Sequence, residues 1–150
     1  MFSKFARPLV LFASLLTCSS AFAETSNCIA IPQLPYTISK EGVYCLVRNM
    51  STKVSKGNAI TIETGNVTLD LKGWNLGGQA AGKATRTIGI YAFNRRNITI
   101  RNGTIRGFYK GIHLDAHFPY TNSGNHLVEN LRLYHNTWKG IEVESSRMGV

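Results

Sequence analysis

The sequence predicts an all-β fold in which the chain coils repeatedly and each strand pairs in parallel with its copy one coil later. Short apolar patches recur in the same order along the chain. Within each patch, apolar and polar residues alternate with period two, as they do in half-buried strands. Helical periodicity is absent beyond the N-terminal segment, and a length of 150 residues suits one domain.

Three families of patches make up this repeat. The first family is centred on isoleucines spaced by 30, 22 and 29 residues, namely Ile60, Ile90, Ile112 and Ile141. The second family covers residues 67–71, 98–102 and 127–130, and the third covers residues 74–76, 103–105 and 131–133. The apolar side chains of each coil are buried only when neighbouring coils stack on it, which is typical of a solenoid.

Two other architectures fit parts of this pattern. A leucine-rich repeat has a similar period, but its L-x-x-L-x-L frame and the helical part of each repeat are missing. An antiparallel sandwich also uses short alternating strands, but it does not require three patches to recur in a fixed order. The parallel solenoid is therefore the preferred prediction.

The second and third families carry a resemblance to a known class of proteins. The run Ile-Thr-Ile-Arg-Asn-Gly-Thr-Ile-Arg-Gly at residues 98–107, preceded by Val-Thr-Leu-Asp-Leu-Lys-Gly at residues 67–73, is similar to the secreted right-handed parallel β-helix proteins of pectate-lyase-like fold. The resemblance covers residues 57–144. It implies a right-handed parallel β-helix of about three to four coils at residues 57–150, preceded by an N-terminal capping segment at residues 24–56. It implies no particular reaction, because such folds host lyases, hydrolases, epimerases and binding proteins.

The N-terminal segment predicts export. Lys4 and Arg7 precede a short apolar run, and a small-x-small cleavage motif ends at Ala23, so residues 1–23 are expected to be a signal peptide. An uncleaved anchor and a lipoprotein modified at Cys18 are the alternatives. No later segment is long and apolar enough to span a membrane. The protein is therefore expected to be secreted or periplasmic.

Two cysteines, Cys28 and Cys45, remain after this cleavage. Because exported proteins meet an oxidising compartment, one disulfide between them is the simplest expectation, and it would stabilise the fold by roughly 3 kcal/mol. Two buried free thiols are the alternative. Two cysteines are too few for a structural zinc site.

The alternation predicts a cluster of titratable residues on the outer face of the coils. If Ile112 points inward, every second residue after it, beginning with the next one, points outward. The equivalent residues one coil later lie beside them in the same columns of the outer face. The candidate catalytic residues of this cluster are His113, Asp115, Glu142 and Glu144. The candidate substrate-binding residues are Tyr91, Arg106, Lys110 and Tyr120. A solvated polar face without chemistry is the alternative interpretation.

No metal site is assigned from the sequence, because His/Cys metal spacings are absent. A carboxylate cluster could nevertheless hold Ca²⁺ through its oxygens. The resemblance implies that a lyase would use Ca²⁺ to neutralise a uronate, while a basic residue such as Arg106 or Lys110 takes the C5 proton. No run of residues matches a lyase or epimerase catalytic motif, so no catalytic residue is carried over from the family. The expected cofactor is therefore none, with Ca²⁺ only for a lyase.

Two further columns are predicted to be structural. Asp70, Arg101 and Glu129 alternate in charge, which indicates an exposed ladder with about 0–1 kcal/mol for each pair. Asn102 and Asn130 fall at the same corner of successive coils, where stacked amides would stabilise the turn.

Charge and compartment together favour an acidic polysaccharide or a cell-envelope glycan as the partner. The net charge is +9, or +7 without the two basic residues of the signal peptide, and an exported protein meets acidic glycan rather than nucleic acid. Aromatic side chains for sugar stacking, Tyr109 and Trp138 among them, are available. The first hypothesis is a glycan-binding module, and the second is a polysaccharide lyase or glycoside hydrolase.

A third hypothesis concerns the end of the sequence. The chain stops shortly after Glu144 without a polar cap, so the last strand is expected to have an unpaired edge. Open edges favour self-association. The sequence therefore also predicts either a truncated, non-functional fragment of a longer β-helix protein or a chain that assembles through this edge.

Overall fold

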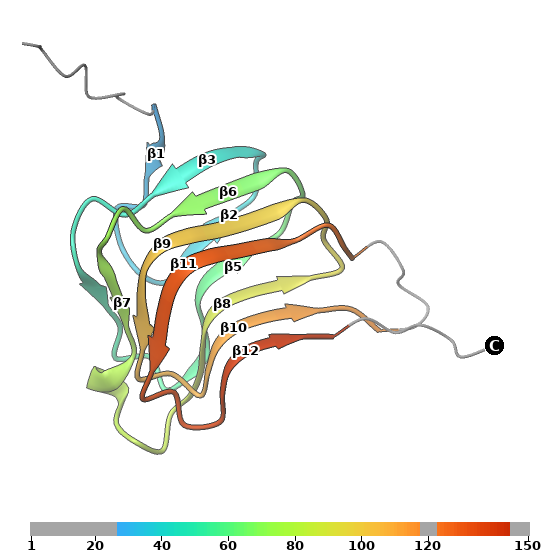
Figure 1. Cartoon of the computed structure of the whole chain (residues 1–150). Helices are drawn as coiled ribbons and strands as arrows, with labels where there is room; N and C mark the ends of the chain where they lie inside the picture. Colours follow the sequence, from blue (N-terminus) through green and yellow to red (C-terminus); the bar gives the residue numbers. More distant parts are fainter. Residues whose placement is uncertain (1–26, 118–122, 145–150) are drawn as a thin grey trace, which may run out of the picture.

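A computed structural model describes residues 27–117 and 123–144 of the chain (Figure 1). Its strands are parallel and stack into a β-solenoid of about four turns, with one short 3-10 helix at Gln79–Ala81. The predicted all-β parallel β-helix is therefore confirmed. The predicted signal peptide and the candidate Tyr120 lie outside the described residues. Among those that are described, no helix has the length and hydropathy needed to cross a bilayer.

Two parallel sheets form the walls of the solenoid. The five-stranded sheet contains, in spatial order, β12 (Lys139–Val143), β10 (Lys110–Asp115), β8 (Arg86–Phe93), β5 (Lys56–Ile62) and β2 (Tyr36–Ile38). The seven-stranded sheet contains β1 (Ile29–Ala30), β3 (Gly42–Cys45), β6 (Val67–Asp70), β9 (Ile98–Arg106), β7 (Asn75–Gly77) and β4 (Met50–Ser51), with β11 (Leu127–Tyr134) paired to β9. The walls enclose one apolar interior (Figure 1).

The three patch families correspond to the strands of this stack. The first family supplies the five-stranded sheet from β5 onward. The second and third families are separate strands, β6 and β7, in one coil, and they run together as the long strands β9 and β11 in the next two. The first half of β9 pairs with β6 and its second half pairs with β7, so the strand bends around the corner of the solenoid (Figure 1).

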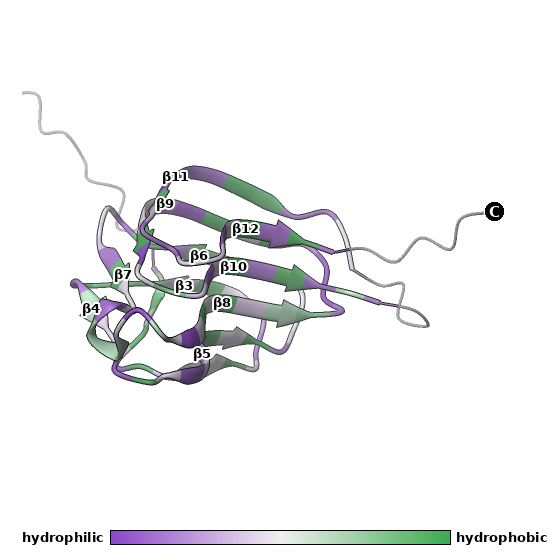
Figure 2. Ribbon diagram, turned by 90° about the horizontal axis from the view of Figure 1, so that it is seen from below, coloured by the Kyte–Doolittle hydropathy of each residue, from purple (hydrophilic) through white to green (hydrophobic). Residues whose placement is uncertain are grey.

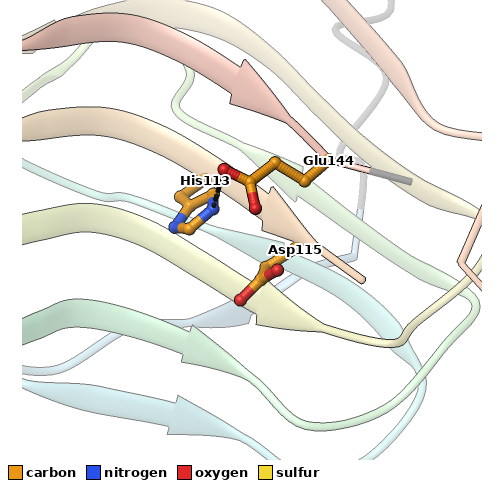
Figure 3. A group of neighbouring side chains, drawn as sticks. All are labelled: His113, Asp115 and Glu144. Atoms are coloured by element: carbon orange, nitrogen blue, oxygen red, sulfur yellow. Dashed lines mark ion pairs between the residues drawn. The ribbon is translucent and has the colours of Figure 1, made fainter. Parts of the chain in front are cut away.

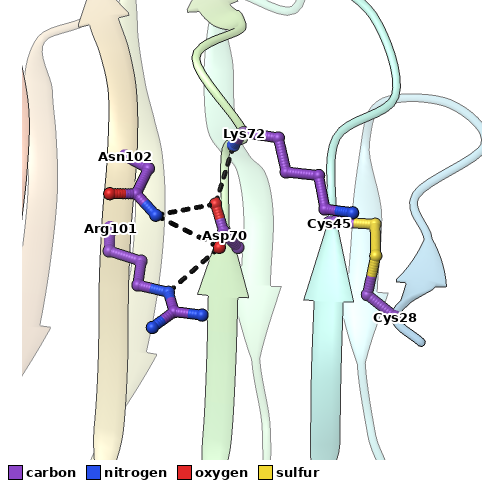
Figure 4. The surroundings of a disulfide bond; sticks show 6 residues. All are labelled: Cys28, Cys45, Asp70, Lys72, Arg101 and Asn102. Atoms are coloured by element: carbon purple, nitrogen blue, oxygen red, sulfur yellow. Dashed lines mark hydrogen bonds and ion pairs between the residues drawn. A yellow bond between two sulfur atoms is a disulfide. The ribbon is translucent and has the colours of Figure 1, made fainter. Parts of the chain in front are cut away.

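The segment predicted as an N-terminal cap contributes strands to both sheets. Strand β2 pairs with β5, β3 with β6, and β4 with β7, so these three strands form a turn in register with the next coil. The predicted disulfide between Cys28 and Cys45 is present, with the two Cα atoms 5.8 Å apart (Figure 4). It ties the residue before β1 to the last residue of β3.

The core is a set of aliphatic columns inside the coils. Ile60, Ile90 and Ile112 lie in register on the five-stranded sheet and are fully buried. In the last described coil, the equivalent Ile141 is 42% exposed, because no described coil covers it. Along β10 and β12, Figure 2 shows hydrophilic residues in purple next to hydrophobic residues in green, as expected for strands with one side toward the core.

Asparagines shape the corners between the walls. Asn66, Asn97 and Asn125 all have positive φ angles near 55°, a conformation that asparagine tolerates better than most residues. Their amides form a chain of hydrogen bonds, 2.8 Å from Asn97 to Asn66 and 2.6 Å from Asn125 to Asn97. At the other corner, the predicted stacking of Asn130 on Asn102 is present at 3.4 Å.

The column containing Asp70 is in the predicted register, but it is not an exposed charge ladder. Asp70 is only 7% exposed, and its carboxylate accepts hydrogen bonds from the Arg101 guanidinium at 3.0 Å and the Lys72 backbone amide at 2.8 Å (Figure 4). The Asn102 side chain donates to both carboxylate oxygens at 3.2 Å. Arg101 lies opposite Glu129 without an ion pair between them in the described part of the chain. Asp70 therefore anchors the corner.

Strict alternation along the five-stranded sheet breaks near the start of β10. Gly111 and Ile112 are both buried, and a Cβ atom added at Gly111 would lie 2.5 Å from the carbonyl oxygen of Gly140. Two consecutive residues therefore face the interior at this corner. As a consequence, Lys110 lies on the outer face together with His113, which a period-two pattern does not predict.

Candidate functional site

Six of the candidate residues gather on the outer face of the five-stranded sheet, five of them toward the ends of β10 and β12. Tyr91, His113 and Glu142 occupy one column. Asp115 ends β10, and Glu144 follows β12 directly. The predicted columns therefore bring these side chains together, as the sequence pattern indicated.

His113 and Glu142 are packed among their neighbours although they face away from the core. Their exposed fractions are 7% and 8%. The ring of Tyr91 lies on one side of His113, with the ring centroids 5.5 Å apart. Carboxylates and lysines lie on the other side. This part of the outer face is therefore a dense layer of charged groups with little access to water.

Two lysines hold the carboxylate of Glu142. Lys110 contacts Oε2, and Lys139 contacts Oε1. Hydrogen bonds from Lys110 and then from Lys139 lower the pKa of Glu142 to about 2. Glu142 is therefore ionised throughout the physiological range, and both its oxygens are engaged. It is better suited to anchoring the two lysines than to acting as a general acid.

Tyr91 orients Asp115. The Tyr91 hydroxyl donates a hydrogen bond of 3.1 Å to Oδ2 of Asp115. Burial, followed by the negative charge of Asp115, raises the pKa of Tyr91 to about 12. Tyr91 therefore stays protonated and fixes one oxygen of the carboxylate. The other oxygen, Oδ1, is buried without a hydrogen-bond partner.

His113, Asp115 and Glu144 converge beyond this point (Figure 3). One potential ligand atom of each residue lies within 4.8 Å of the other two. His113 Nε2 lies 3.4 Å from Oε2 of Glu142 and 3.7 Å from Oε1 of Glu144, and it is buried without forming a hydrogen bond. Side chains of this kind can bind a cation or hold a proton for acid–base chemistry.

The remaining candidates divide between this cluster and other regions. Lys110 belongs to the cluster through its contacts with Glu142 and His113. Arg106 does not. It lies at the end of β9, where its guanidinium donates to the Tyr134 hydroxyl at 3.1 Å and lines a separate hollow of about 360 Å³. Lys139 was not predicted, although its position exactly one period after Lys110 was a usable signal.

A row of basic residues crosses the same sheet at the other end of its strands. Four strands, β5, β8, β10 and β12, begin with a lysine or arginine, namely Lys56, Arg86, Lys110 and Lys139. Lys56 pairs in register with Arg86, and Lys110 pairs in register with Lys139. Lys110 itself lies opposite Ile88, two residues after Arg86, so the row crosses the four strands with a step between β8 and β10.

Two aromatic rings accompany this row. The Arg86 guanidinium lies 4.5 Å above the centre of the Tyr109 ring. Tyr109 in turn stacks on Trp138, with centroids 6.0 Å apart and planes inclined by 19°. Trp138 is 61% exposed. We call the four basic residues together with Tyr109 and Trp138 the basic–aromatic stripe.

Comparisons of the chain with protein-family models, with curated proteins and with solved structures found no match. The resemblance to pectate-lyase-like proteins therefore stays a prediction beyond the shared architecture of a parallel β-solenoid. The outer face of the five-stranded sheet carries two features that could act on a ligand. These are the basic–aromatic stripe at the start of the strands and the adjoining His113 cluster further along them, with Lys110 belonging to both.

Proposed function

We propose that the protein is exported and binds acidic polysaccharide along the outer face of its five-stranded sheet. The observation that carries this proposal is the basic–aromatic stripe. Neighbouring strands lie about 4.8 Å apart, so Lys56 and Arg86 are neighbours at the spacing of the coils, and so are Lys110 and Lys139. A linear polyanion lying along the solenoid axis would meet one cation on each strand.

The cations of the stripe differ in how far they are neutralised. Lys110 and Lys139 share Glu142. Lys56 and Arg86 have no carboxylate partner in the ranges that the structure describes. Arg86 is held over Tyr109, and a planar guanidinium can pair with a carboxylate through two hydrogen bonds. Arg86 is therefore the strongest single contact for a uronate carboxylate.

The aromatic rings supply a surface for the sugar itself. Trp138 is exposed and rigidly supported by its stacking on Tyr109. Aromatic rings with one exposed face contribute large contact areas at low cost in side-chain entropy. A polysaccharide would therefore combine stacking at Trp138 with ion pairing at Arg86.

Export is the setting in which such a ligand is met. The disulfide between Cys28 and Cys45 is typical of proteins outside the reducing cytosol. The predicted signal peptide at residues 1–23 supports the same compartment. The partner is accordingly a glycan of the cell envelope or of the surroundings.

The test measures binding of polygalacturonate, with neutral dextran as the matched uncharged polymer. We expect binding to polygalacturonate only, weakening as salt rises. Arg86→Gln and Trp138→Ala should each weaken it by about fivefold or more, equivalent to about 1 kcal/mol. Arg132→Gln, on an exposed position of β11 in the other sheet, is the control and should bind like wild type. Equal binding of dextran, or wild-type affinity in both folded stripe variants, would overturn the proposal.

A polysaccharide lyase or glycoside hydrolase is the second candidate, favoured by the convergence of Asp115 and Glu144 beside His113. The assay follows unsaturated uronate ends and new reducing ends during incubation with the same polymers, with and without Ca²⁺. Product formation that is lost in Asp115→Asn would assign catalysis to this cluster. Binding without product would leave the binding function alone.

A further inference from the structure

We propose that His113, Asp115 and Glu144 form a binding site for a divalent transition-metal ion, with Zn²⁺ as the species the ligand set fits best. The site is built from two neighbouring strands. His113 and Asp115 are successive outward residues of β10, and Glu144 follows β12 (Figure 3). The site lies further along these strands than the basic–aromatic stripe, whose Lys110 contacts His113, and the proposal does not depend on polysaccharide binding.

The geometry of the three side chains fits a single ion. Zinc ligands at about 2.1 Å from the ion in tetrahedral geometry lie about 3.4 Å from one another. His113 Nε2 lies 3.7 Å from Glu144 Oε1, and all three ligand atoms fall within 4.8 Å of one another. Small side-chain rotations therefore bring the set to coordination distance.

Unpartnered buried atoms point to the same place. His113 is 7% exposed, and its Nε2 makes no hydrogen bond, although Oε2 of Glu142 lies 3.4 Å from it. Oδ1 of Asp115 is likewise buried without one, while its other oxygen is held by Tyr91. Buried polar atoms nearly always have partners in folded proteins. An ion between His113 and Asp115 would supply a partner to both.

The charges around the site also favour a cation. Lys110 and Lys139 both pair with Glu142. Neither Asp115 nor Glu144 has a lysine or arginine within ion-pair distance among the residues that the structure describes; their charged contacts are His117 and His113. In the described part of the chain, histidines are therefore the only basic side chains at ion-pair distance from these two carboxylates.

The imidazole decides which ion is expected. Ca²⁺ and Mg²⁺ prefer oxygen ligands throughout, whereas Zn²⁺ takes imidazole nitrogen together with carboxylate oxygen. Coordination through Nε2 requires the ring proton of His113 to sit on Nδ1. Lys110 Nζ lies 3.4 Å from Nδ1, so this ammonium group opposes the metal-bound state. Three protein ligands would leave a position on the ion open to water or another ligand.

The test uses the purified protein, free of any histidine tag and stripped with a chelator, titrated with Zn²⁺ by calorimetry. Co²⁺ absorption spectra provide a second measurement of the coordination sphere. We expect one ion for each chain and a higher melting temperature with the ion present. His113→Gln and Glu144→Gln should each weaken binding by about tenfold or more. Glu144 is half-exposed, so this second variant is expected to fold even where others do not.

Two further variants sharpen the result. His135→Asn removes an exposed histidine elsewhere and should leave the affinity unchanged. Lys110→Gln removes the ammonium group beside Nδ1 and should strengthen Zn²⁺ binding. The proposal is overturned if the wild type takes up no Zn²⁺, if His113→Gln binds as tightly as wild type, or if Ca²⁺ binds as tightly as Zn²⁺.

Discussion

The carboxylate of Asp70 is enclosed by donors from two successive coils. Arg101, Lys72 and Asn102 all donate to it, and it is almost fully buried. Because the side chain of Arg101 is 37% exposed, solvent screens part of the ion pair. The hydrogen bonds to the buried oxygens are not screened in the same way.

We therefore expect Asp70→Asn to lower the free energy of unfolding by about 1.5–3 kcal/mol, the range for hydrogen bonds to a charged group. Urea denaturation measures this change. Glu129→Gln is the matched control, because Glu129 lies in the same column one coil beyond Arg101 without pairing with it. The control should change stability by no more than about 0.5 kcal/mol. Equal losses in the two variants would contradict the structural role of Asp70.

The partly buried side chain of His126 should make the stability of the fold depend on pH. Burial lowers its pKa below the ordinary value of 6.5, and its Nε2 lies 3.1 Å from the Ser123 hydroxyl. The folded state therefore resists a proton that the unfolded chain accepts. The contribution of neutral His126 to the stability of the fold is therefore complete above pH 6.5. It is lost as the pH falls from 6.5 through the lower pKa that His126 has in the folded state.

Melting temperatures measured across this range should fall more steeply in wild type than in His126→Gln, which cannot take up the proton. His135→Asn, at an exposed histidine, should keep the slope of the wild type. Parallel slopes in wild type and His126→Gln would show that the environment of His126 does not disfavour its charged form.

At the scale of the element, the strands of the five-stranded sheet depend on a close approach of backbones at one corner. A Cβ atom at Gly111 would lie 2.5 Å from the Gly140 carbonyl oxygen, and backbone cannot move aside as a flexible side chain can. The equivalent glycine one coil later has more room. A Cβ atom at Gly140 would meet Leu133 at 3.5 Å, which is ordinary contact.

Gly111→Ala should therefore destabilise the protein by about 2 kcal/mol or more, because overpacking against backbone forces the strands apart. Gly140→Ala should change stability by less than about 1 kcal/mol, since neither position has a positive φ angle. Thermal and urea denaturation of the two variants check the contrast. Similar losses in both would mean that the general cost of adding a methyl group, and not the close approach, determines the effect.

The same corner explains which part of the candidate site could be predicted from the sequence. The period-two pattern placed His113, Asp115 and Glu142 on one face, because alternation holds along the strand after Ile112. It did not place Lys110 there, because two consecutive inward residues at a corner shift the alternation by one position. Arg106 was expected near the site on charge alone, but it lies on a different strand and points to Tyr134.

At the scale of the whole molecule, the repeat carried the prediction of the fold. Equivalent residues recur at fixed spacing because each coil must place its apolar side chains on those of its neighbours. Burial of Asp70 could not be predicted in the same way, because it depends on donors from Arg101 and Asn102 that meet only after the coils have stacked. The ligand could be predicted even less, since the repeat requires only that the outer face be polar and does not depend on what that face binds.

A solenoid stabilises its interior coils from both sides, whereas the last coil that the structure describes has a described neighbour on one side. Ile90 is fully buried between neighbours, whereas Ile141, two coils later in the same column, is 42% exposed. Ile90→Ala should therefore cost about 2–5 kcal/mol, as for a fully buried aliphatic residue, and Ile141→Ala about 1 kcal/mol or less. Denaturation at several protein concentrations measures both. If Ile141→Ala instead lowered the free energy of unfolding as much as Ile90→Ala, and did so in a concentration-dependent way, a second copy would cover the edge of β12 in solution. Only a contact between molecules would make the burial of Ile141 depend on protein concentration.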